Sequence, residues 1–176
     1  PGTITPFIIT GAGSTVQIQV KDDGSSIGRF GGGTYSSSTL ANCDKLTAIT
    51  QWGNFNGLEK IYRLGSADLN EVPSDFLSTV TSTENMFINA TNFTHENIRT
   101  WDVSNVVNMS YMFKDANAFD QDIGAWDVGK VTNMEYMFYA ATNFDQDIGA
   151  WGSKTSNVAN MRNMFYSATN FNQNIG

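Results

Sequence analysis

The sequence is poor in the residues that most often carry chemistry. It holds one cysteine, Cys43, and one histidine, His95, among 176 residues. A single cysteine forms no internal disulfide and no cysteine-based zinc site. One histidine without a supporting motif gives no basis for a Ser-His-Asp catalytic triad. The glycines at 31–33 lack the following Lys-Ser/Thr of a phosphate loop. We therefore expect a protein that is not an enzyme, with Cys43 as a buried core thiol and His95 as a loop residue.

Charge and long apolar runs are also scarce. Charged residues make up 15% of the chain, and the 17 acidic residues outnumber the 10 basic ones, for a net charge of −7. Such a surface repels phosphates, so we expect no nucleic-acid partner. No apolar run approaches the roughly 18 residues of a spanning helix, so we expect no membrane span in this chain. Apolar residues still make up 40% of the chain, enough to bury a core.

What the sequence has instead is an internal repeat. The octapeptide FDQDIGAW stands at 119–126 and again at 144–151, and a third version, FNQNIG, begins at 171. Trp101, Trp126 and Trp151 are 25 residues apart. A weaker version of the frame continues upstream to Leu69 and Leu46, so we count about six coils of 23–27 residues from position 40 onward. Because the chain starts with Pro and stops inside a repeat, we expect a processed chain or a fragment.

Two spacings alternate within one repeat. The apolar residues between Val106 and Ala116 follow the spacing of a helix face, which predicts a short helix over 106–116 with Ser104 and Asn105 as N-caps. The segment 119–126 is too short for a helix and predicts a turn leading into a brief strand. Elements this small bury their apolar faces only by stacking on neighbouring coils, with strand parallel to strand. We therefore predict an α/β repeat in which identical residues stack: Phe on Phe, Ile on Ile and Trp on Trp.

The repeat resembles a known family of surface proteins. The stretch WDVSNVVNMSYMFKDANAFDQDIGAWDVGKVTNMEYMF, at 101–138, is similar to the tandem units of BspA-type leucine-rich-repeat proteins, and CDKLTAITQWG at 43–53 resembles the phrase that opens such repeats. The resemblance covers roughly residues 40–176. It implies a right-handed leucine-rich-repeat-like solenoid on bacterial, protist or virus surfaces, with adhesion or binding roles and no catalytic positions. Insertions at 93–101 and 151–158 depart from the pattern and predict locally irregular coils.

Residues 1–40 differ from the repeat. Phe7-Ile8-Ile9 and the alternating segment 16–20 predict strands. We expect 1–40 to form a small N-terminal β cap on the first coil, or the end of a preceding β domain, and 41–176 to form the solenoid.

Two sets of side chains are candidate sites. Tyr111, Tyr136, Tyr139 and Tyr166 share repeat phases, so they could grip a partner, although they could instead shield the row beneath them. Asp120, Asp122, Asp145 and Asp147 stack in successive D-Q-D-I-G turns, where calcium would relieve their repulsion. Because the third copy has Asn172 and Asn174, solvated acidic turns without a cofactor are the simpler interpretation. Asn108, Asn133 and Asn160 share one phase and predict a structural ladder.

Two functions follow as hypotheses. The first is an adhesion module, extracellular or on a cell surface, that binds a protein or glycan on another surface. The alternative is a structural or assembly subunit of a virion, fibre or extracellular filament, in which the chain contacts copies of itself.

Overall fold

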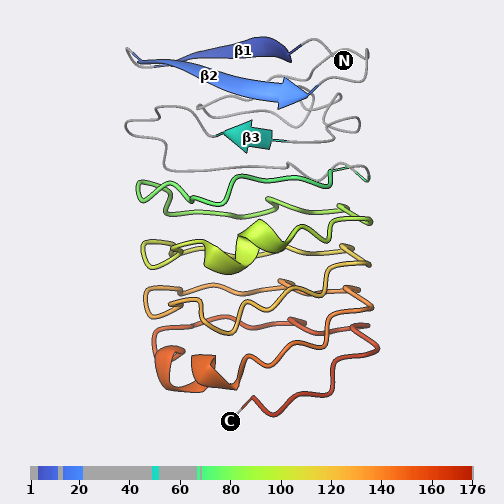
Figure 1. Cartoon of the computed structure of the whole chain (residues 1–176). Helices are drawn as coiled ribbons and strands as arrows, with labels where there is room; N and C mark the ends of the chain where they lie inside the picture. Colours follow the sequence, from blue (N-terminus) through green and yellow to red (C-terminus); the bar gives the residue numbers. More distant parts are fainter. Residues whose placement is uncertain (1–3, 12–13, 22–48, 52–66, 68, 176) are drawn as a thin grey trace.

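The structure, a computed structural model, describes residues 4–11, 14–21, 49–51, 67 and 69–175. The strands β1 (Ile4–Gly11) and β2 (Ser14–Lys21) pair antiparallel, and β3 (Ile49–Gln51) joins β2, giving the order β1-β2-β3. Both predicted N-terminal strands fall within β1 and β2, which lie at the opposite end of the molecule from the C-terminus (Figure 1). Their role as a cap stays a prediction. The predictions for Cys43, for the glycines at 31–33 and for the coils at 46 and 52 concern residues outside this description.

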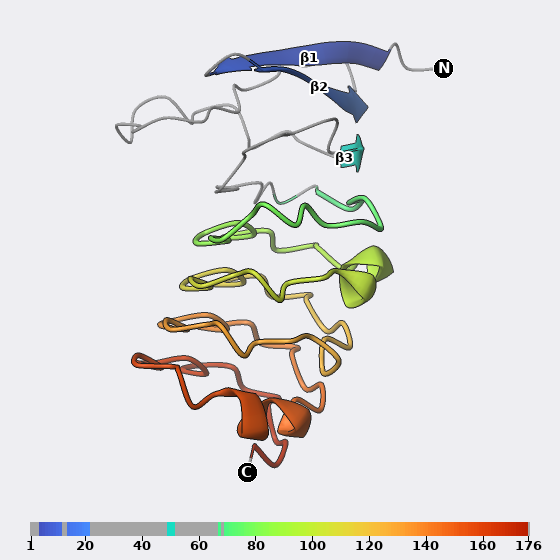
Figure 2. The ribbon, with the colours of Figure 1, turned by 90° about the vertical axis from the view of Figure 1, so that its left-hand side faces the viewer.

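From residue 69 onward the chain lies in flat coils stacked one on another (Figures 1 and 2). We number four of them: the first coil spans 78–103, the second 104–128, the third 129–154 and the fourth 155–175. Parallel bridges join equivalent residues of successive coils, running from Ser82 to Asn108, Asn133 and Asn160. Whether the stack belongs to the right-handed leucine-rich-repeat class stays a prediction.

The predicted helix over 106–116 is wrong. Tyr111 and Asp115 have positive φ values of 59° and 60°, which a right-handed helix does not allow. Hydrogen bonds inside the segment span three residues, as in the bond from the Met112 N–H to the Met109 carbonyl (3.2 Å). Chained turns of this kind return apolar side chains to one side every three or four residues, so their spacing imitates a helix face. Ser104 and Asn105 consequently cap no helix.

The second coil is joined to the third by backbone hydrogen bonds at alternate residues. The N–H groups of Met109, Tyr111, Phe113 and Asp115 donate to carbonyls of the third coil at 2.8–2.9 Å. The same pattern joins the first coil to the second and the third to the fourth. The predicted strand within 119–126 is not formed, because side chains replace the backbone bonds there.

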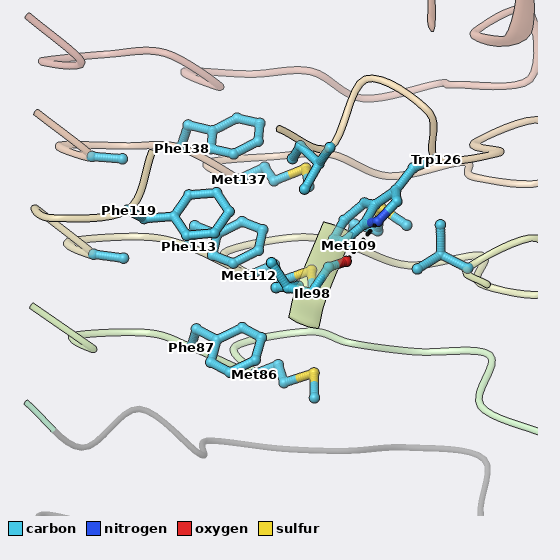
Figure 3. Close-up of a cluster of buried hydrophobic side chains, with 14 of the residues drawn as sticks. Met86, Phe87, Ile98, Met109, Met112, Phe113, Phe119, Trp126, Met137 and Phe138 are labelled. Carbon is cyan, nitrogen blue, oxygen red and sulfur yellow. Dashed lines mark hydrogen bonds between the residues drawn. The ribbon is translucent and has the colours of Figure 1, made fainter. Parts of the chain in front are cut away.

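The core consists of columns of identical aromatic rings. Phe87, Phe113, Phe138 and Phe165 stack with centroids 5.5–5.6 Å apart. A second column, Phe93, Phe119, Phe144 and Phe171, stacks beside the first at 5.7–6.1 Å. Within each coil the two rings are 3.9–4.4 Å apart. Methionine side chains fill the space next to these rings (Figure 3), which suits their flexible thioethers.

Tryptophan adds a polar link to this core. The Trp126 Nε1–H donates to the carbonyl of Ile98 in the preceding coil at 3.1 Å (Figure 3). Trp101 and Trp151 make the same bond to Pro73 and Ile123, each 28 residues upstream. Each tryptophan thus ties its coil to the one before it through an acceptor 28 residues upstream.

Both predicted irregular coils are confirmed as irregular. The insertions are taken up by the 3-10 helices η2 (Glu96–Thr100) and η3 (Gly149–Lys154) (Figures 1 and 2). His95, predicted as a loop residue, caps η2, since its Nδ1 accepts the N–H of Asn97 at 3.3 Å. No helix in the described part of the chain is both long and apolar enough to cross a membrane.

Candidate functional site

The four candidate tyrosines lie together on the surface of the second, third and fourth coils. The rings of Tyr111 and Tyr136 stack at 5.0 Å with planes 8° apart, and those of Tyr139 and Tyr166 stack at 5.1 Å and 13°. Tyr136 and Tyr139 meet at 5.3 Å and join the two stacks. We call these four residues the tyrosine cluster. Tyr166 is its most accessible member, at 59% exposure.

Two cations flank the cluster that the sequence analysis did not single out. Lys114 Nζ lies 5.1 Å from the centre of the Tyr139 ring, and the Arg162 guanidinium lies 5.9 Å from that of Tyr136. Lys114 precedes Tyr139 by one repeat in the same phase, a signal that was available in the sequence. Such contacts contribute about 0.5–1 kcal/mol each at exposed sites. The inner rings, Tyr136 and Tyr139, therefore each have a stacked ring and a cation as neighbours, and the Tyr136 hydroxyl accepts the Asn163 amide at 2.9 Å.

Acidic groups complete the surroundings. Arg162 lies 3.9 Å from the Glu135 carboxylate, and Lys114 pairs with Asp115. Partial burial, followed by the nearby Glu135 charge, raises the pKa of the Tyr111 hydroxyl above its usual value. Tyr111 is therefore a neutral hydroxyl, able to donate a hydrogen bond, at any physiological pH.

The backbone beneath the cluster is strained at two of its members. Tyr111 and Tyr136 have φ values of 59° and 55°, in the left-handed region. The equivalent residues of the first and fourth coils, Asn85 and Asn163, share this conformation at 59° and 53°. Asparagine tolerates this region well, whereas a bulky aromatic residue does so rarely. The two tyrosines thus stand where the backbone favours a smaller residue.

The four aspartates of the D-Q-D-I-G turns divide into two pairs with different partners. Asp120 Oδ1 accepts the Asp145 N–H at 3.0 Å and the Gln146 amide at 2.8 Å, both from the next coil. Asp145 Oδ1 repeats this with the Asn172 N–H at 2.9 Å and the Gln173 amide at 2.8 Å. The bond from the Asn172 N–H, and after it the bond from the Gln173 amide, hold the pKa of the Asp145 carboxyl below its usual value. This pair therefore links coils.

Asp122 and Asp147 each close a turn within their own coil. Each accepts the N–H of the glycine two residues later, Gly124 at 3.1 Å and Gly149 at 2.8 Å. Asp122 also lies 3.7 Å from Arg99 of the first coil. Within the described ranges, no three acidic, histidine or cysteine side chains gather as metal ligands. The calcium hypothesis for these four residues stays a prediction, and the hydrogen bonds give the carboxylates another role.

The asparagine phase 108, 133, 160 forms a ladder through its backbone bridges. Each side-chain oxygen accepts the N–H two residues on, at 3.0 Å. The amides of Asn108 and Asn160 reach back to Glu84 and Glu135 of the preceding coils, at 3.4 and 3.1 Å. The ladder is therefore structural, although its amides bond to glutamates and not to each other.

Comparison with known proteins gives one family match. Residues 58–176 match the family model described as "Mycoplasma protein of unknown function, DUF285". No curated protein and no solved structure matches the chain. Since the matched region covers more than half of the 176 residues, this chain belongs to the DUF285 family.

Proposed function

We propose that this chain is a non-catalytic interaction module, displayed outside the cell or on a virion surface, which binds a partner through the tyrosine cluster. On this proposal the stacked coils form a right-handed, BspA-type leucine-rich-repeat solenoid. The inter-coil bonding and the repeat length support that interpretation. A rigid stack with a regular face suits an extended partner.

The observation that carries the proposal is the pair of tyrosines in left-handed backbone. An L-residue in this region costs about 1–2 kcal/mol, and asparagine occupies the same place in the neighbouring coils. Ring stacking returns about 0.5–1.5 kcal/mol per pair, so stability alone gives little reason for tyrosine at these positions. Strained residues that stability does not explain are typical of functional sites, and tyrosine and arginine are the residues most enriched in binding hot spots.

A binding screen tests the proposal. Wild-type protein and the double variant Tyr139→Ser/Tyr166→Ser would be passed over immobilised glycans and extracellular-matrix proteins. We expect at least one ligand whose affinity falls about tenfold or more in the double variant, as a loss of hot-spot contacts implies. Lys130→Ala is the matched control, because Lys130 is exposed and bonds to Asn105 outside the cluster.

Two results would reject the proposal. The first is equal binding by the wild type and the double variant, which would place the binding surface elsewhere. The second is a filament or symmetric assembly, seen by light scattering and electron microscopy, whose formation the double variant abolishes. The tyrosines would then be subunit contacts and the chain a structural component.

A further inference from the structure

The four tyrosines of the cluster form an unbroken chain of ring contacts. Tyr111 meets Tyr136 at 5.0 Å, Tyr136 meets Tyr139 at 5.3 Å, and Tyr139 meets Tyr166 at 5.1 Å. The first contact is the shortest of the three, and its ring planes are 8° apart. It joins the second coil to the third, and each of these two coils has a described coil on either side.

The rings of this first contact can be reached from solvent. Tyr111 and Tyr136 are both partly exposed, whereas the indoles of Trp101, Trp126 and Trp151 are only 2–3% exposed. The phenylalanine rings of the core have no hydroxyl hydrogen to lose. A dissolved one-electron oxidant that approaches these coils therefore meets tyrosine before any other easily oxidised ring.

The backbone holds the two rings against each other. Tyr111 and Tyr136 share the left-handed conformation, with φ values of 59° and 55°, so their side chains leave the backbone in the same direction. The Tyr111 N–H donates to the Glu135 carbonyl at 2.9 Å, which fixes the two coils side by side. The Tyr136 hydroxyl accepts the Asn163 amide at 2.9 Å, and the Arg162 guanidinium lies over the same ring at 5.9 Å. Two reactive groups held in contact have a high effective concentration toward each other.

We infer that Tyr111 and Tyr136 form an oxidative modification site, at which a one-electron oxidant of the peroxidase class, with hydrogen peroxide, couples them into dityrosine. Each phenol gives one electron to the oxidant and one proton to water, which leaves a neutral phenoxyl radical. The two radicals form a carbon–carbon bond between their ortho positions. Each ring becomes aromatic again when its ortho hydrogen moves to the phenoxyl oxygen. The pair thus loses two electrons and two protons, which one hydrogen peroxide molecule takes up to form two waters.

The new bond would join the second and third coils covalently. Like a disulfide, it would limit the freedom of the unfolded chain, so the cross-linked protein should unfold at a higher urea concentration than the unmodified protein. This inference does not rest on the proposed function, because it requires no binding partner.

The test oxidises the intact chain in dilute solution with a ruthenium tris-bipyridyl complex and persulfate under visible light, a one-electron oxidant that also acts in urea. Trypsin places Tyr111 on the peptide 100–114. Tyr136 and Tyr139 lie together on the peptide 131–154. Mass spectrometry of the monomeric product should show these two peptides joined, two hydrogen atoms lighter than their sum. Fragmentation should place the bond between Tyr111 and Tyr136.

Three controls make the test specific. Tyr111→Phe keeps a ring in the stack and removes the phenol, so the joined peptides should disappear and oxidation should no longer raise the urea midpoint. Tyr139→Ser/Tyr166→Ser removes the other two contacts and should keep the joined peptides. The same double variant is expected to lose partner binding, so the two proposals can fail separately. Oxidation of the wild type in urea should lower the yield of joined peptides about tenfold or more, because the rings are no longer held together.

Four outcomes would overturn the inference. They are the absence of joined peptides in the folded monomer, a bond that forms at Tyr139 and not at Tyr136, an equal yield in urea, and a cross-link found only between separate chains. The third outcome would show that the stacked geometry does not direct the coupling.

Discussion

Replacing Trp126 by alanine is the sharpest test of the stacked-coil core. The indole is 2% exposed and stacks on Trp151 at 6.5 Å. It also contacts the Phe113 ring at 6.3 Å and donates to the Ile98 carbonyl at 3.1 Å. One side chain therefore joins three successive coils, and its removal affects both the apolar column and a buried polar bond.

The magnitude follows from burial. A tryptophan buries about 150–250 Å², which at about 25 cal/mol per Å² corresponds to about 4–6 kcal/mol of transfer free energy. Measured losses for such truncations are about 3–5 kcal/mol, because surrounding groups relax into part of the cavity. We expect Trp126→Ala to fall in that range. Trp126→Phe keeps much of the ring and removes the indole bond, whereas the Trp101 N–H still donates to the Ile98 carbonyl at 3.3 Å, so the lost bond should cost about 0.5–1.5 kcal/mol.

The assay is urea unfolding combined with amide exchange resolved by coil. Exchange is needed because stacked repeats can lose cooperativity, and a single free energy of unfolding then misleads. Trp126→Ala should increase exchange most in the third and fourth coils. Lys130→Ala, at an exposed position, should change stability by less than about 0.5 kcal/mol. A Trp126→Ala loss below about 1 kcal/mol would show that the tryptophan column does not hold the coils together.

Three further predictions concern single positions. Gly124→Ala should destabilise by about 1–3 kcal/mol in urea unfolding, because its Cβ would lie 2.5 Å from the Asp147 carbonyl oxygen; wild-type stability would contradict the close coil approach. The pKa of Asp145 is lowered in the folded state, so the ionised carboxylate stabilises the fold above the unfolded pKa near 3.8, and this stabilisation is lost as pH falls through the folded pKa. Asp145→Asn should therefore reduce the difference in urea midpoint between pH 7 and about pH 3. An unchanged difference would refute this assignment. Tyr111→Asn should change stability by less than about 1 kcal/mol, since strain relief and lost stacking offset each other, while binding through the tyrosine cluster falls; a large loss of stability would make the tyrosine structural.

The sequence predicted the columns of the core because identical side chains recur in phase. Phenylalanine, isoleucine and tryptophan each recur at nearly constant spacing. Such spacing is expected when each copy packs against the equivalent residue of the next coil. The columns at Phe113 and Phe119 follow this rule. The sequence could not reveal the tryptophan hydrogen bond, since its acceptor is a backbone carbonyl that no side-chain pattern marks.

The predicted helix over 106–116 was wrong because the repeat satisfies its backbone N–H groups in another way. A three- and four-residue spacing of apolar side chains arises from a helix and also from chained turns. The choice between them depends on where the N–H groups find acceptors. In 106–116 four of the eleven N–H groups bond to the next coil, as Phe113 does to Met137 at 2.9 Å. Such bonds form only between stacked coils, so the spacing of apolar residues within one segment could not predict them.

The candidate site was predicted unevenly. Phase predicted the two stacked tyrosine pairs, because residues in one phase are neighbours in a stack, but it did not predict the contact between Tyr136 and Tyr139. It did not reveal the strained backbone at Tyr111 and Tyr136, which depends on the turn type. Nor did it separate the acidic residues into those that link coils, such as Asp120, and those that close a turn, such as Asp122. Both are aspartates in the same turn, and only the direction of the neighbouring N–H distinguishes them.

Four positions of the repeated octapeptide each serve an adjacent turn or coil. Asp120 supplies the acceptor that backbone geometry does not provide at this corner, and Asp122 closes the turn that follows. Gly124 leaves room for the carbonyl of Asp147, and Trp126 reaches back to the preceding coil. Each of these contacts is made with an adjacent turn or coil, so the same residue is required in every further coil. An octapeptide retained for ligand binding would need its side chains free, whereas these are used within the stack. The tyrosine cluster, which varies from coil to coil, is therefore the better place to seek a partner.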